Sequence, residues 1–332
     1  MSIRNRISRQ EPISAEQTQQ LTSLSSMEPH FAPKATTPRS SKTVFIIGGL
    51  RVYVYGLEEV EKKGYADVAV LYLAHGRLRD YGDMEVMAHE ILHQYGNAEG
   101  RRSAGLIAVA VDMRNHGERK LSDKSNDAWD VGNELHAQDM LSIISGSAQD
   151  FDLLIDYLPT YLPQFNKFYN IMSGRSLGGH TSWRLGTNSS SKLHGLAIII
   201  GSPNMGALLL DRLGVDSNAL SSLADDIYKI PYDTLSELLT EEQRRRWPRA
   251  LHDLVAEIDR NTAEKFPKDV PTYILNGKLD PLVPDRFSEA WVAKRKAEGY
   301  TNLDHFAQEN TGHECTQIMV GNVADWLVKL FT

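Results

Sequence analysis

One hydroxyl, that of Ser176, stands between two glycines in the stretch GRSLG (174–178). The apolar run FYNIM comes just before it, and the helical pattern LGGHTSWRLG follows it. A G-x-S-x-G sequence between a strand and a helix is typical of a tight turn that exposes the serine as a nucleophile. An ordinary glycine-rich loop is the alternative, but both flanking elements favour the turn.

A serine nucleophile needs a base, most often a histidine that a carboxylate holds in the right tautomer. In this arrangement the acid and then the histidine follow the serine along the chain. Asp280 lies in YILNGKLDPLVP after a strand-like run, and His313 lies in FAQENTGHECTQ before the last helical pattern. We therefore predict Ser176, Asp280 and His313 as nucleophile, acid and base. Each partner also has a structural interpretation, because Asp280 could start a turn and His313 could cap the last helix.

Acyl transfer also requires N–H groups that face the oxygen on which negative charge develops. Leu177 follows the serine at the start of a helix, so its amide is a candidate donor. A second donor usually follows an earlier strand, where the sequence reads His75-Gly76-Arg77. We assign that donor to the amide of Arg77 or Gly76, with an ordinary strand-ending turn as the alternative.

Substrate contacts are harder to predict. Arg77 and Arg175 lie near the proposed site in sequence, where either could bind a substrate carboxylate, although an internal salt bridge is the stronger alternative. Leu209 and neighbouring leucines could line an apolar acyl pocket or could pack together as core.

The stretch VDMRNHGER (111–119) combines Asp112, Arg114 and His116. We interpret these side chains as braces for the loop beside the oxyanion site. A metal site formed with His75 is the alternative, but no compact ligand spacing supports it. Phosphate-loop and dinucleotide-binding patterns are absent where a strand would need them, so we predict neither a metal nor a cofactor.

The elements around these residues alternate between buried strands and helical patterns. Strand-like runs are TVFIIGG (43–49), VAVLYLAHG (68–76), LIAVAVD (106–112), FYNIM (168–172), LAIIIGSP (196–203) and PTYILNG (271–277). Such alternation predicts an α/β fold with a mostly parallel, doubly wound sheet. Between the strand ending near residue 201 and the strand starting near 272, only helical segments occur, so we predict a helical cap at about 203–267.

Composition limits the class of protein. The 332 residues carry a net charge of −7, which disfavours nucleic-acid binding, and Cys315 is the single cysteine, so no internal disulfide can form. The apolar runs are shorter than the roughly 18 residues of a membrane span. Residues 1–42 are rich in Ser, Thr, Gln and Pro, which predicts a flexible or loosely docked extension before one domain over 43–332. We expect a cytoplasmic protein, with a mitochondrial location as the alternative.

The segments AHGR, VDMRNHG, GRSLGGH, GKLDPLVP and TGHE, spread over about residues 43–330, resemble the α/β-hydrolase superfamily. More narrowly, the chain is similar to the dienelactone-hydrolase and prolyl-oligopeptidase-like branch, in particular to small single-domain esterase-like proteins. This resemblance implies a Ser-Asp-His triad at Ser176, Asp280 and His313 and no cofactor. No β-propeller domain precedes the catalytic part, so a dedicated peptidase is not expected. Some dienelactone hydrolases use cysteine where this chain has serine.

We therefore expect a serine hydrolase that cleaves a small-molecule carboxylic ester, thioester or lactone through an acyl-enzyme. The alternative is a non-hydrolytic protein of the same fold, either a biosynthetic cyclase or acyl transferase or a ligand-binding module. Neither the acyl and alcohol specificity nor the oligomeric state follows from the sequence.

Overall fold

The computed structural model describes residues 31–216, 218–220 and 226–332. Its centre is an eight-stranded sheet in the order β1-β2-β4-β3-β5-β6-β7-β8. The strands are β1 (Lys42–Ile47), β2 (Leu50–Tyr55), β3 (Asp67–Ala74), β4 (Gly105–Ala110), β5 (Lys167–Arg175), β6 (Gly195–Ile199), β7 (Thr272–Gly277) and β8 (Leu303–Gln308). From β4 to β8 all neighbouring strands are parallel, whereas β1–β2 and β2–β4 are antiparallel. The predicted mostly parallel sheet is confirmed.

The β1–β2 hairpin differs from the prediction, which included β1 but not β2. Ile47 pairs with Leu50, so Gly48 and Gly49 alone form the turn. Both glycines have positive φ, 58° and 80°, which a two-residue hairpin turn requires. A Gly-Gly pair between two alternating apolar runs is the signal that identifies such a hairpin.

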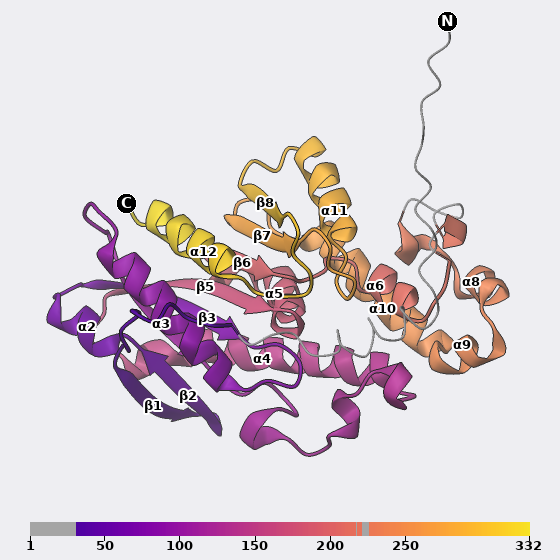
Figure 1. Ribbon diagram of the computed structural model, residues 1–332, viewed down its shortest axis with the longest axis horizontal. Helices are drawn as coiled ribbons and strands as arrows, with labels where there is room; N and C mark the ends of the chain where they lie inside the picture. The colour runs from indigo at the N-terminus through magenta and orange to yellow at the C-terminus, as the bar shows by residue number, and fades with distance from the viewer. Residues whose placement is uncertain (1–30, 217, 221–225) are drawn as a thin grey trace, which may run out of the picture.

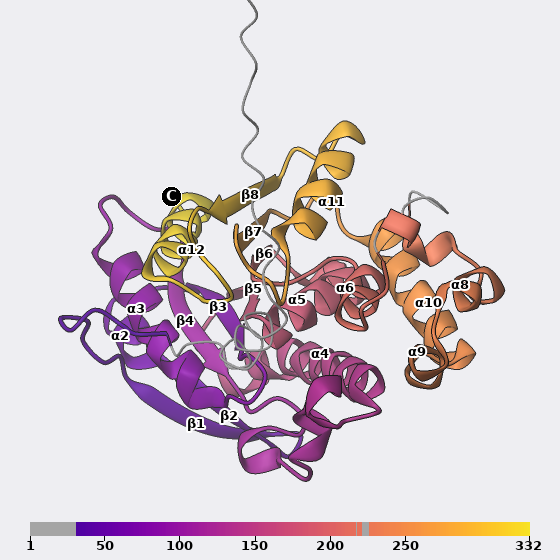
Figure 2. The same ribbon diagram turned by 45° about the vertical axis from the view of Figure 1, so that its right-hand side comes forward.

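Helices cover both faces of the sheet, as Figures 1 and 2 show. On one face α3 (Tyr81–Asn97) and α12 (Gln317–Leu330) lie side by side and pack on Leu71 and Leu73 of β3. On the other face α4 (His136–Tyr161) and α5 (Leu177–Asn188) pack on Val70 and Tyr72. Because successive strand side chains point to opposite faces, one strand supplies both cores. Two further helices are α2 (Leu57–Lys62) and α11 (Asp285–Ala297).

Helices alone occupy the described residues between β6 and β7, where the sequence predicts a cap. They are α6 (Met205–Arg212), α8 (Tyr232–Leu238), α9 (Glu241–Arg246) and α10 (Arg249–Lys265), and they form the right-hand end of the molecule in Figure 1. The buried carboxylate of Asp259 on α10 accepts hydrogen bonds from Met205 N and Gly206 N, both at 2.8 Å. These two hydrogen bonds satisfy backbone N–H groups in the first turn of α6, so the contact holds α6 in place.

The described part of the N-terminal segment is docked on α3. Phe31 is buried, the Thr37 hydroxyl donates to Glu90, and Ser40 N donates to His89 Nδ1 at 3.1 Å. Most of the extension predicted over 1–42 lies outside the described residues. Among the helices that the structure describes, none combines the length and the apolar character needed to cross a bilayer.

Candidate active site

Ser176 lies at the turn from β5 to α5 in a backbone conformation that side chains rarely adopt, with φ 53° and ψ −117°. The flanking glycines permit this turn. A side chain at Gly178 would collide with the Ala74 carbonyl of β3, and one at Gly174 would collide with the Gly178 carbonyl. Ser176 N donates to Ile199 O of β6 at 3.0 Å. The predicted strand, turn and helix therefore occur together around this serine.

Two loops at the same edge of the sheet bring His313 and Asp280 to Ser176. Ser176 Oγ lies 2.9 Å from His313 Nε2, and His313 Nδ1 lies 2.7 Å from Asp280 Oδ2. The other carboxylate oxygen, Asp280 Oδ1, accepts from Leu282 N and Val283 N, both at 2.8 Å. A hydroxyl, an imidazole and a fixed carboxylate thus form one continuous chain of hydrogen bonds, and the structure brings the three predicted residues together.

Two of the three residues predicted to supply oxyanion donors line the cavity beside Ser176. As the first residue of α5, Leu177 has an N–H without an acceptor inside its own helix. Arg77 and Leu177 both line the cavity beside Ser176, whereas Gly76 does not. Of the two candidates after β3, the structure places Arg77 at the cavity.

His75 fixes the backbone that presents Arg77. Its Nε2 accepts from Met113 N at 3.0 Å, and its Nδ1 lies 2.8 Å from Gly76 O. Because Nε2 is an acceptor, the ring proton is on Nδ1 and is donated to that carbonyl. Burial lowers the pKa of His75 to about 3, so the ring is neutral at ordinary pH.

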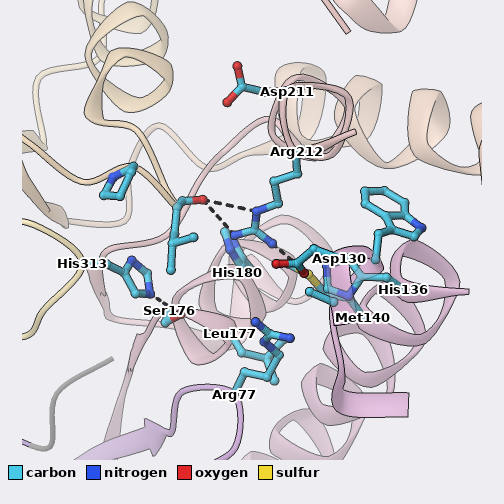
Figure 3. Close-up of a pocket in the computed structure, with 14 residues that line it drawn as sticks. Arg77, Asp130, His136, Met140, Ser176, Leu177, His180, Asp211, Arg212 and His313 are labelled. Carbon is cyan, nitrogen blue, oxygen red and sulfur yellow. Dashed lines mark hydrogen bonds between the residues drawn. The ribbon is translucent and has the colours of Figure 1, made fainter. Parts of the chain in front are cut away.

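Ser176 and His313 open into a cavity of about 350 Å³. Opposite them lies a second wall, which Figure 3 shows in close-up. We call it the outer wall; it comprises Ala128, Trp129, Asp130, His136 and Met140 from the loop before α4 and from α4, together with Asp211 and Arg212 at the end of α6. Among the described residues of the helical insertion, only those of α6 line the cavity, and the loop before α4 together with α4 supplies most of the outer wall.

Two further histidines that line the cavity, His136 and His180, are neutral. Burial, followed by the charges of Arg212 and Arg77, lowers the pKa of His136 to about 3. Burial, followed by the charge of Arg212, likewise lowers the pKa of His180 on α5 to about 3. His180 Nδ1 accepts from Ser202 N at 3.1 Å, and His136 Nδ1 lies 2.8 Å from Asp127 O. These rings therefore add shape and hydrogen bonds to the cavity but no charge at neutral pH.

Residues 70–325 match the model of the alpha/beta hydrolase family. The chain belongs to this family. Among solved structures it is similar to TT1662 from Thermus thermophilus, with 18% identity, a TM-score of 0.59 and coverage of 88% of this chain and 98% of that one. It is also similar to Est1E from Butyrivibrio proteoclasticus with ferulic acid bound, with 16% identity, a TM-score of 0.52 and coverage of 86% and 96%. At these identities the likeness shows a shared fold. No curated protein matches the chain significantly.

Two residues predicted to contact the substrate do not line the cavity in this member of the alpha/beta hydrolase family. The Arg175 side chain is fully buried and pairs with Asp83 of α3, so it lies on the α3 side of the sheet edge and not in the cavity. Leu209 is also fully buried and packs in the core with Leu208 and Leu210. The predicted substrate contacts are therefore wrong, and the alternatives hold: Arg175 forms an internal salt bridge, and Leu209 is part of the core. The narrower likeness to the dienelactone-hydrolase branch stays a prediction.

The loop 111–119 has the bracing role that we expected. Asp112 accepts from Tyr81 N at 2.9 Å and from Glu118 N at 2.8 Å, and Arg114 bonds to Asp150 at 3.0 Å. Both Asp112 oxygens therefore accept hydrogen bonds from backbone N–H groups, as a bracing role requires. Within the described ranges, no group of three or more His, Cys, Asp or Glu side chains could hold a metal ion.

Proposed function

We propose that this protein is a serine hydrolase that cleaves a carboxylic ester, thioester or lactone through an acyl-enzyme on Ser176. The observation that carries the proposal is the chain from Ser176 Oγ to His313 to Asp280, with distances of 2.9 and 2.7 Å, at the mouth of a cavity. Membership of the alpha/beta hydrolase family supports a hydrolytic enzyme.

In the first half of the reaction, His313 Nε2 takes the proton of Ser176 as Oγ attacks the substrate carbonyl. The carbonyl oxygen becomes negatively charged in the tetrahedral intermediate. The amides of Leu177 and Arg77 are the donors proposed to stabilise that charge. His313 then protonates the leaving alcohol or thiol, and Ser176 is left acylated.

In the second half, His313 Nε2 removes a proton from water as the water attacks the acyl-enzyme. The intermediate then collapses, His313 returns the proton to Ser176 Oγ, and the carboxylic acid is released. Asp280 keeps the imidazole oriented and stabilises its positive charge in both halves. Since two backbone N–H groups hold Asp280 Oδ1, its other oxygen is fixed toward His313.

Pre-steady-state kinetics tests the proposal. With 4-nitrophenyl acetate and butyrate, we expect a burst of nitrophenol close to one equivalent per enzyme, followed by slower turnover. Ser176→Ala should abolish the burst and lower turnover by about 10⁶-fold. The matched control is Ser182→Ala on the same helix. Among the described residues, the Ser182 hydroxyl bonds to Gly178 O alone, at 2.9 Å.

A Ser176→Ala variant that keeps the burst would show that the nucleophile is another residue. Ring-closed or transferred acyl products in place of the free acid would support the acyl-transfer alternative, in which the same serine acts but water is excluded.

A further inference from the structure

Two arginine side chains reach into the cavity beside Ser176, and neither forms a salt bridge with a carboxylate of the described residues. Arg212 extends from the end of α6, and Arg77 extends from the loop after β3 (Figure 3). In the described part of the chain, no Asp or Glu oxygen lies within 4.0 Å of either guanidinium group. Buried or half-buried arginines are usually paired, so this arrangement requires an explanation.

The hydrogen bonds of both arginines go to neutral acceptors. Arg212 Nε and Nη2 donate to Leu282 O at 3.3 and 2.8 Å, and its Nη1 lies 3.5 Å from Met140 Sδ. Arg77 Nη1 donates to Asn126 O at 2.7 Å. A guanidinium has five N–H groups, so each side chain is held in place and still keeps donors for a ligand.

Carboxylates attract the two arginines from beyond salt-bridge distance. Asp127 and Asp130 act on Arg77, and Asp280 and Asp211 act on Arg212. Burial, and next the charge of Arg77, lower the pKa of Arg212 to about 10, so Arg212 stays charged at neutral pH. Of the two carboxylates in the outer wall, Asp211 pairs with Arg286 at 2.7 Å, and Asp130 is solvent-exposed. With His136 and His180 neutral, an anion in this cavity would be attracted to both arginines.

We propose that the cavity binds an ester that carries a carboxylate, and that Arg212 and Arg77 are its two cationic contacts. This inference rests on the proposed function, because the bound group must be part of the substrate that Ser176 attacks. The planar guanidinium presents paired N–H groups that match a carboxylate, which makes arginine well suited to this contact. A cavity of about 350 Å³ is at the small end of ligand sites, which favours a short chain between the ester and the carboxylate.

A purely structural role for Arg212 is the competing explanation. Its acceptor, Leu282 O, belongs to the loop in which Leu282 N donates to Asp280. On this explanation, the role of Arg212 is limited to stabilising the loop that carries Asp280. If Arg212 is structural, loss of its positive charge should lower kcat/KM equally for charged and neutral esters. If Arg212 binds the substrate carboxylate, the loss should be larger for charged esters.

The experiment compares matched ester pairs on the wild-type protein. In the first pair the acyl part differs, 4-nitrophenyl adipate monoester against the corresponding 4-nitrophenyl methyl diester. In the second pair the alcohol part differs, the acetate ester of 4-hydroxybutyric acid against that of its methyl ester. We expect kcat/KM to be about ten-fold or more higher for the charged member of at least one pair. Equal rates, or faster turnover of the neutral member in both pairs, would overturn the inference.

Three variants identify the source of the preference. Arg212→Gln and Arg77→Gln should each lower the charged-to-neutral ratio of kcat/KM by about ten-fold, whereas Arg212→Lys, which keeps the charge, should retain most of it. The control is Arg249→Met on α10, whose side chain pairs with Asp233 outside the cavity. If Arg212→Lys and Arg212→Gln lose activity equally on both esters, and Arg77→Gln leaves the ratio unchanged, the arginines are structural.

The two proposals fail in different ways. A burst on Ser176 with neutral esters, but no preference for charged esters, would contradict the proposal of an anionic substrate and would still support the hydrolase. The absence of turnover and of covalent labelling with any ester would contradict the proposed hydrolase function.

Discussion

The two sides of the cavity come from different elements and are held by different contacts. On one side Ser176, His313 and Asp280 come from turns at the ends of parallel strands and are joined by hydrogen bonds of 2.9 and 2.7 Å. On the other side the outer wall comes from the loop before α4, from α4 itself and from the end of α6. Its contacts are packing, hydrogen bonds to carbonyl groups and the ion pair between Asp211 and Arg286. The first side has the geometry of a reaction centre, and the second has that of a binding surface.

This difference assigns separate roles to the two sides. Groups that act on the reacting atoms lower kcat when they are lost, because their interactions strengthen in the transition state. Groups that hold the substrate equally in the ground and transition states change KM. The predictions below test whether the two sides separate in this way.

After the loss of the nucleophile itself, the largest effect is expected at Asp280. In Asp280→Asn, an amide oxygen that kept the hydrogen bonds from Leu282 N and Val283 N would turn the NH₂ group toward His313 Nδ1. The histidine would then be held in the wrong tautomer, so kcat should fall by about 10⁴-fold with KM little changed. Steady-state kinetics on a 4-nitrophenyl ester measures both constants.

A second Asp–His pair provides the matched control. Asp285 Oδ1 lies 2.9 Å from His305 Nε2, and Lys278 lies 3.0 Å from the other oxygen, but the pair is not part of the cavity. Asp285→Asn should keep kcat within a few-fold of the wild type. Equal losses in the two variants would mean that Asp280 acts through loop stability alone.

A smaller effect is expected in the outer wall at Trp129. This side chain is buried, lines the cavity and packs edge-on against His136, with 5.0 Å between ring centroids. Trp129→Ala should raise KM for an apolar acyl ester by about ten-fold and leave kcat within about three-fold, while Trp129→Phe should restore KM. A loss of kcat that equals the loss in Asp280→Asn would contradict the separation of the two sides.

The smallest effect concerns acid stability. Because the pKa of His180 is lowered to about 3 in the folded protein, the unfolded chain binds one more proton between about pH 3 and pH 6.5. Stability due to this residue is therefore present above pH 6.5 and is lost as the pH falls. In His180→Asn, which retains an acceptor for Ser202 N, urea denaturation should show a slope of unfolding free energy against pH that is lower by about 1.4 kcal/mol per pH unit between pH 4 and 6.

The control for this measurement is His93→Asn, at a partly exposed position on α3. An unchanged acid slope in His180→Asn would show that His180 takes up its proton equally in the folded and unfolded states.

The same contrast explains what could be predicted from the sequence. Ser176 was predictable because glycines at 174 and 178 are required by collisions with nearby backbone, and the flanking strand and helix are local patterns. His313 and Asp280 followed from chain order. Arg212, Trp129 and His136 had no such signal, because only tertiary packing brings the end of α6 and the loop before α4 to the cavity.

The wrong predictions have a similar physical origin. Arg175 neighbours Ser176 in sequence, but successive residues of a strand point to opposite faces, and its side chain reaches Asp83 on the α3 side. Leu209 lies on α6, as Arg212 does, but faces the core and not the cavity. Proximity in sequence to the nucleophile or to the cavity was therefore a poor guide to contact.

The central claim is that one serine hydroxyl is activated at this site, and covalent labelling tests it most directly. A fluorophosphonate probe, followed by proteolysis and peptide mass spectrometry, should place a single adduct on Ser176, and His313→Ala should slow the labelling by at least about 10³-fold. An adduct on any other residue, or labelling of Ser176→Ala at the wild-type rate, would contradict the account.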